Sequence, residues 1–166
     1  MTGNEKADQL AKEALQKRNI KKLKLDYSDC YNIIKHFILS EWQKEWNDNN
    51  CFMQRVKPDI KQWESSYQKN RKEEIVLSRL RMGCALLDVK HFYEGVAPPM
   101  CEECNVRLTS KHVLMECTKY THERGSMVMH LNDLGLQGSI FGLLGDGFPT
   151  SILMSFLRKN RLLDLL

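Results

Sequence analysis

The chain has 166 residues, enough for one ordinary domain or for two small modules joined by a linker. Hydrophobic residues make up 42% of the chain, which excludes a disordered composition, and only 9 glycines and 4 prolines interrupt its many helix formers. A formal net charge of +4 permits a nucleic-acid partner without demanding one.

Targeting signals are not evident. No apolar run reaches the roughly 18 residues that a membrane span needs, and the polar start MTGNEKADQL is unlike a signal peptide. We therefore expect an intracellular protein without a membrane partner, and the sequence does not distinguish nucleus from cytoplasm. In a reducing compartment, the 6 cysteines are better suited to metal binding than to disulfides.

Helical periodicity dominates the first half of the chain. Thr2 and Glu5 have the spacing of a capping box at the start of a helix over residues 4–17. A basic stretch at 17–24 is predicted to be an exposed linker. A long amphipathic helix then reaches Trp46, and its apolar side chains recur every three or four residues, which predicts a core-facing stripe: Tyr31, Ile34, Phe37, Ile38, Trp42 and Trp46.

The second half continues in shorter helices. We expect an element around residues 60–67, a strong helix over 71–87, a helix over 118–131, a glycine-rich break at 135–147, and apolar helices at 140–144 and 150–165. The predicted fold class is mainly α, an irregular helical chain with a small zinc-bound turn. The predicted divisions are 1–17, a linker at 18–27, a helical region at 28–97, a zinc segment at 98–125 and an apolar tail at 126–166.

The strongest chemical signal is a Cys-x2-Cys-x7-His-x4-Cys pattern formed by Cys101, Cys104, His112 and Cys117. Zinc prefers four tetrahedral thiolate and imidazole ligands. Two cysteines separated by two residues can turn in a tight knuckle, which we expect to form a short hairpin, and Thr109 or Ser110 is expected to cap the turn that follows. Four protein ligands leave no open position, so the pattern predicts a structural zinc ion.

Other uses of these residues stay open. The four ligands could be unrelated residues of a cytosolic chain, and His122 and His130 compete with His112 for the imidazole position. The remaining cysteines lack partners at ligand spacing and are interpreted as buried or incidental thiols: Cys30, Cys51 and Cys84.

The segment TGNEKADQLAKEA, residues 2–14, resembles the last helix of ribonuclease H domains. The resemblance implies that Asp8 is a remnant of the carboxylate group that holds two Mg²⁺ ions in a complete ribonuclease H, with Asn4 and Glu5 at its edge. One aspartate cannot assemble such a centre, which needs clustered carboxylates. Without the resemblance, Glu5 and Asp8 simply suit the positive end of a helix dipole.

The rest of the chain resembles the tail that follows ribonuclease H in reverse transcriptase polyproteins of arthropod-type non-LTR retrotransposons. The likeness runs through the Trp42–Trp46 helix, LSRLRMGC at 77–84 with Cys84 where the family usually has His, the Cys/His pattern, Arg124 and the apolar end at 152–157. The strands that would carry the other carboxylates are not in this sequence. We therefore expect a truncated retrotransposon-derived protein whose first helix is orphaned from an α/β ribonuclease H domain and docks loosely or not at all.

The resemblance makes the tail a candidate for binding RNA or single-stranded DNA. Arg79, Arg81, Lys21 and Lys22 could neutralise phosphates, and three aromatic side chains could stack on bases: Trp63, Tyr67 and Tyr120. Alternatively, the two arginines pair with Glu73, Glu74 or Asp88, and the aromatics are core.

Three hypotheses follow. The first is a non-catalytic, zinc-containing, nucleic-acid-binding module. The second is a ribonuclease of RNA–DNA hybrids, if upstream sequence supplies the missing carboxylates. The third is a protein-interaction module that oligomerises through the apolar C-terminal helices.

Overall fold

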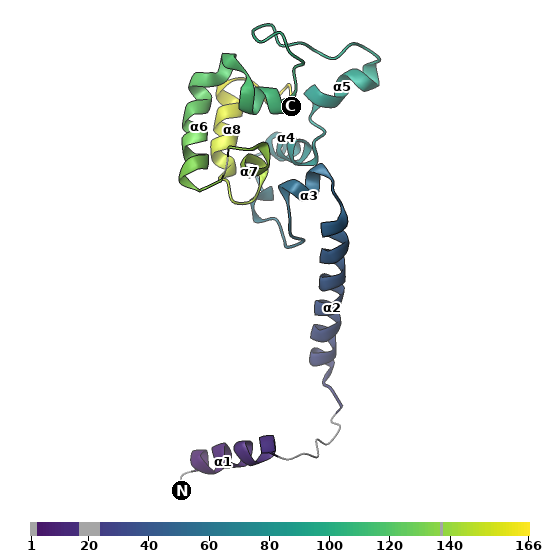
Figure 1. Cartoon of the computed structure of the whole chain (residues 1–166), viewed down its shortest axis with the longest axis vertical. Helices are drawn as coiled ribbons and strands as arrows, with labels where there is room; N and C mark the ends of the chain where they lie inside the picture. The colour runs from purple at the N-terminus through teal and green to yellow at the C-terminus, as the bar shows by residue number, and fades with distance from the viewer. Residues whose placement is uncertain (1–2, 17–23, 137) are drawn as a thin grey trace. The chain divides into compact units, whose positions relative to one another are not determined.

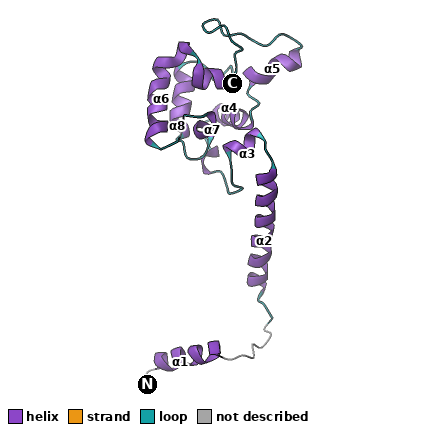
Figure 2. Ribbon diagram, viewed as in Figure 1, coloured by secondary structure: helices purple, strands orange, loops and turns teal. Residues whose placement is uncertain are grey.

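The computed structural model describes residues 3–16, 24–136 and 138–166. These described residues are mainly helical and contain no strand (Figure 2). An isolated antiparallel bridge pairs Met100 with Arg107. The chain divides into two compact units, Met1–Ile38 and Leu39–Leu166. The predicted mainly-α class is therefore confirmed. No helix in the described ranges is long and apolar enough to cross a membrane.

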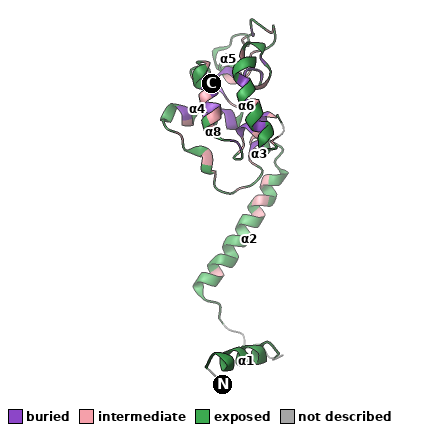
Figure 3. Ribbon diagram, turned by 90° about the vertical axis from the view of Figure 1, so that its left-hand side faces the viewer, coloured by how far each residue is buried: buried purple, intermediate pink, exposed green. Residues whose placement is uncertain are grey.

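The first unit contains α1 (Gly3–Gln16) and the first part of α2 (Tyr27–Asp48). None of residues 3–16 is buried, and Leu15 is 88% exposed (Figure 3). Thr2, the expected cap of α1, lies outside the described residues. The small apolar stripe of α1 is therefore exposed and is not part of a core.

The prediction that α2 faces a core is wrong. Residues 27–48 include no buried side chain, and Phe37 and Trp42 remain 65% and 52% exposed. Its C-terminal end, in the second unit, is held through polar contacts. The Trp46 indole donates to the Lys57 carbonyl at 2.7 Å, and the Gln43 amide donates to the Pro58 carbonyl at 2.9 Å. Periodicity identified the helix correctly but could not tell whether anything covers its apolar side.

The second unit continues with α3 (Phe52–Val56), which the sequence analysis missed, and the short 3-10 turn η1 (Glu64–Ser66). Cys51 caps α3, because its sulfur accepts a hydrogen bond from the Gln54 amide at 3.4 Å. The exposed Cys51 thiol therefore has a local structural role.

The single helix predicted over 71–87 is in fact two helices, α4 (Arg71–Met82) and α5 (Leu86–Glu94). The break is at Gly83, which adopts the left-handed conformation with φ of 70° and donates its amide to carbonyls at the end of α4. A side chain there would be strained and would also meet the Phe52 ring at 3.0 Å.

Three further α-helices follow the cysteine segment, residues 101–117: α6 (Thr121–Asp133), α7 (Ile140–Leu144) and α8 (Thr150–Lys159). The bounds of α7 match the prediction, whereas α8 ends before the predicted residue 165. In the second unit, α6 and α8 lie side by side (Figure 1).

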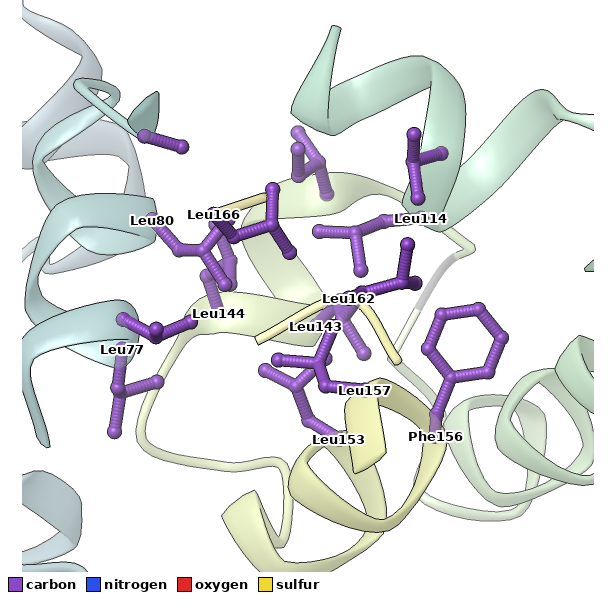
Figure 4. Close-up of a cluster of buried hydrophobic side chains, with 14 of the residues drawn as sticks. Leu77, Leu80, Leu114, Leu143, Leu144, Leu153, Phe156, Leu157, Leu162 and Leu166 are labelled. Atoms are coloured by element: carbon purple, nitrogen blue, oxygen red, sulfur yellow. The ribbon is translucent and has the colours of Figure 1, made fainter. Parts of the chain in front are cut away.

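One hydrophobic core joins α3, α4, α7, α8 and the end of the chain (Figure 4). Its fully buried side chains include Leu77, Leu80, Leu114, Leu143, Leu144, Leu153, Leu157 and Leu162. The C-terminal helices therefore bury most of their apolar side chains within their own unit. Little apolar surface remains exposed on them for the oligomeric contact that was predicted from the sequence.

Candidate metal centre

The first two cysteines lie on a chain reversal. The bridge between Met100 and Arg107 closes the loop, and the Asn105 amide donates to the Cys101 carbonyl at 2.9 Å. Asn105 has a φ of 54°, a conformation that asparagine tolerates better than most residues. This reversal brings Cys104 back beside Cys101, and it is the short hairpin-like turn that the Cys-x2-Cys spacing predicted.

The other two cluster residues come from one helical turn. Thr109 caps it, since its hydroxyl accepts from the His112 amide at 3.1 Å. The turn η2 (His112–Glu116) is π-helical, and the Cys117 amide donates to the His112 carbonyl at 2.7 Å, five residues earlier. This wide turn sets His112 and Cys117 on the same side.

The opposite side of η2 belongs to the core. Val113 and Leu114 are 1% and 0% exposed and pack into the main hydrophobic cluster. The cysteine segment is therefore anchored in the second unit and is not an appendage to it.

Cys101, Cys104, His112 and Cys117 converge, and their ligand atoms all lie within 4.8 Å of one another. The sulfurs of Cys101 and Cys117 are 3.7 Å apart. Three of the four residues are buried and Cys104 is half-buried. The described residues contain one such cluster, and these four residues could together hold a metal ion.

The state of His112 supports this assignment. Its Nε2 atom is buried and has no hydrogen-bond partner among the protein atoms. An unsatisfied buried nitrogen costs about 1–3 kcal/mol, and a metal ion would satisfy it. The other ring nitrogen, Nδ1, is 3.7 Å from a carboxylate oxygen of Glu116. Metal-bound histidines commonly have a carboxylate on this side.

The surroundings tune the sulfurs differently. The hydroxyl and the backbone amide of Thr118 lie 3.3 and 3.5 Å from the Cys104 sulfur and lower the pKa of that thiol. Burial raises the pKa of the Cys117 thiol. The hydrogen bond from Lys111, at 2.9 Å, lowers the pKa of Glu116, so this carboxylate stays charged beside His112.

The competing histidines are elsewhere. The His122 side chain is 98% exposed, and the exposed His130 ring contacts the Ser126 carbonyl at 2.7 Å. Neither ring belongs to the cluster, which leaves His112 as its imidazole.

Arg81 is not the surface cation that the sequence analysis expected. It is 3% exposed, its guanidinium lies 3.9 Å from the centre of the Trp63 ring, and its Nε donates to the Leu144 carbonyl at 2.9 Å. Nη2 donates to the Ser65 hydroxyl at 2.6 Å. Burial lowers the pKa of Arg81 from its ordinary value to about 10, and the charge of Asp146 partly offsets this effect. Arg81 therefore joins parts of the core and cannot reach a phosphate without unpacking.

The other predicted phosphate contacts differ among themselves. Arg79 is half-buried on α4, while Lys21 and Lys22 lie outside the described residues. The acidic partners considered for the arginines are engaged elsewhere: Glu73 pairs with Arg158, Glu74 with Arg71, and the Asp88 carboxylate accepts from the Ser110 amide.

Of the three aromatic candidates for base stacking, one has a side chain that is largely exposed to solvent. Tyr67 is 78% exposed. Trp63 is half-buried beneath Arg81, and Tyr120 packs edge-on against Phe156 with ring centres 6.2 Å apart.

Asp8, the remnant ligand that the resemblance implied, is not part of a metal-binding cluster in the described residues. Its exposed carboxylate pairs with Lys12 on the next turn of α1 at 2.8 Å. In the part of the chain that the structure describes, no carboxylate cluster accompanies it.

Sequence reasoning assigned no role at this site to Arg124 or Thr118. Thr118 follows Cys117 directly and contacts the Cys104 sulfur. Arg124 is 6% exposed and donates to the Cys117 carbonyl. The spacing of the ligands carries no information on such contacts, and an arginine in a polar helix is usually exposed.

Comparisons with protein-family models, with curated proteins and with solved structures give no match to this chain. The chemistry of the centre therefore carries the functional conclusion.

Proposed function

We propose that Cys101, Cys104, His112 and Cys117 bind one zinc ion in a closed, structural centre. The observation that carries the proposal is the convergence of three sulfurs and a ring nitrogen of His112 within 4.8 Å, beside a buried His112 Nε2 that has no hydrogen-bond partner. Thiolates and imidazole are the ligands that zinc prefers, and four of them complete a tetrahedron. No position is left for a catalytic water, so the ion holds the cysteine segment in shape.

Metal analysis of reduced protein tests this directly. We expect one equivalent of zinc, and its loss in a Cys117→Ser variant. Cys51→Ser is the matched control, because this exposed thiol lies outside the cluster and its removal should leave the zinc content unchanged. A metal-free protein after purification without chelators, with no uptake of added zinc, would contradict the proposal.

We further propose that the protein is related to the tail of a retrotransposon polyprotein and binds RNA or single-stranded DNA without cleaving it. The support is the resemblance in sequence, the formal charge of +4 and the basic run that includes Lys21 and Lys22. Arg79 remains a candidate phosphate contact, whereas Arg81 is not one because its side chain is buried.

Salt dependence distinguishes this binding from adventitious association. Each phosphate contact on a single strand adds about 0.7 to the slope of log affinity against log salt. Replacing Lys21 and Lys22 by Gln should therefore lower that slope by about 1.4. The control replaces Lys61 and Lys69, two exposed lysines of the second unit, and should change the slope less. Equal salt-dependence slopes for the two double variants would show that Lys21 and Lys22 do not contact the nucleic acid.

The ribonuclease alternative makes a separate prediction. Mg²⁺-dependent cleavage of an RNA–DNA hybrid that is lost in Asp8→Asn would support it. The exposed, singly paired Asp8 gives it no support, and we expect no turnover from this chain.

Oligomerisation remains the second candidate, now through α2. Several of its large apolar side chains are more than half exposed, among them Tyr31, Ile34, Phe37, Ile38 and Trp42. A second copy of the chain could cover them, because large exposed apolar areas mark contact surfaces. Light scattering across a range of concentrations tests this, and a monomer throughout would contradict it.

A further inference from the structure

Arg124 is a buried cation on α6. It is 6% exposed, and a buried charge is costly unless an opposite charge compensates it. The neighbouring Glu123 carboxylate does not compensate the charge of Arg124, because its Oε1 lies 3.9 Å from Nδ1 of His122.

The hydrogen bonds of Arg124 go to neutral groups. Nη2 donates to the backbone carbonyl of Cys117 and lies 3.4 Å from the Thr121 hydroxyl, and Nη1 is buried without a hydrogen-bond partner. Among residues 3–16, 24–136 and 138–166, no carboxylate lies within the 4.0 Å of an ion pair with Arg124.

Arg81, the second buried arginine of the unit, also lacks a carboxylate within 4.0 Å among the described residues, but a more distant carboxylate acts on it. Arg81 faces the charge of Asp146, which acts to raise the pKa of its guanidinium. Arg124 is buried without an ion pair to any carboxylate of the described residues. The negative charge that balances the Arg124 guanidinium must come from another source. Its contact with Cys117 points to the ligand cluster as that source.

The metal centre supplies a negative charge. Three thiolates and a neutral imidazole around a divalent zinc ion leave a net charge of −1. Arg124 holds the backbone of one of these thiolate residues. We infer that Arg124 is a positioning residue of the metal centre, which fixes Cys117 and balances the negative charge of the loaded site. This inference rests on the proposed zinc centre.

A double-mutant cycle separates charge balance from a purely structural contact. Arg124→Met removes the charge and should weaken zinc binding about 10- to 100-fold, the usual effect of losing an outer-shell partner. Arg124→Lys keeps the charge and should stay within about threefold of the unmodified protein. The dissociation constant is measured by competition with a chromophoric chelator, with helix content checked by circular dichroism.

The second arm of the cycle changes the charge of the centre. Cys104→His leaves two thiolates and two imidazoles, which is also a zinc-binding set, and makes the loaded centre neutral. In that background Arg124→Met should cost less than about threefold, because no net charge remains to balance. Cys104 suits this change because it is the half-buried ligand.

Three results would overturn the inference. They are an unchanged zinc affinity in Arg124→Met, an equal loss in both backgrounds, and a loss in Arg124→Lys as large as that in Arg124→Met. Arg81→Met is the matched control: it also removes a buried arginine bonded to a carbonyl, and should leave zinc affinity unchanged. If the unmodified chain binds no zinc, the proposed function itself fails, which is a different result from tight binding that ignores Arg124.

Discussion

Removing zinc should destabilise the whole second unit. The ion would link residues 101 and 117, which are 16 positions apart, and a cross-link closing a loop of about 15 residues contributes about 3 kcal/mol. Satisfying the buried His112 Nε2 adds about 1–3 kcal/mol. We therefore expect the free energy of unfolding to fall by about 4–6 kcal/mol when the metal leaves.

The loss should reach the core because Val113 and Leu114 lie on the same turn as His112. Urea unfolding followed by circular dichroism measures it, with and without a strong chelator under reducing conditions. For a slope near 2 kcal/mol per M, the midpoint should drop by about 2–3 M. Cys117→Ser is the control and should not respond to the chelator. Equal midpoints after metal analysis has shown that zinc is gone would refute the reasoning.

Three other predictions concern packing and charge. Leu157→Ala should cost about 3–4 kcal/mol and Leu15→Ala less than about 0.5 kcal/mol in urea unfolding, because the first side chain is 0% and the second 88% exposed; similar costs would contradict the fold. Hydrogen bonds from Ser65, helped by the charge of Arg81, lower the pKa of Asp146 below 3.8 against the opposing effect of burial. The stability that this carboxylate contributes is complete above its ordinary pKa and is lost as the pH falls through its lowered pKa in the folded protein. The free energy of unfolding of Asp146→Asn should therefore depend less on pH in this acidic range. An unchanged pH dependence would contradict the prediction. Deleting residues 1–38 should shift the melting temperature by less than about 4 °C, since no described residue there is buried; a collapse of the transition would show that the second unit depends on the first.

The metal centre was the part of the molecule most accessible from sequence. A Cys-x2-Cys knuckle and a nearby His–Cys pair are local, so their spacing alone carries the geometry. The structure places the four side chains together, as the spacing predicted, and Thr109 caps the turn as one of the two expected residues.

Contacts between distant parts of the chain could not be predicted in this way. Arg81 meets Ser65 and Leu144, which lie 16 and 63 residues away, and nothing in the local pattern around Arg81 distinguishes it from an exposed arginine. The exposure of α2 was missed for a related reason: periodicity shows which side of a helix is apolar, whereas burial depends on whether another element covers it. The break at Gly83 had a local signal, because glycine commonly ends helices.

The segment 112–117, which consists of η2 and Cys117, contacts both the ligand cluster and the leucine-rich interior. Inserting or deleting one residue in it would rotate everything downstream by about 100° about the helix axis. Either His112 or Cys117 would then leave the cluster, or Val113 and Leu114 would leave the interior. The number of residues in this segment is consequently as restricted as their identity.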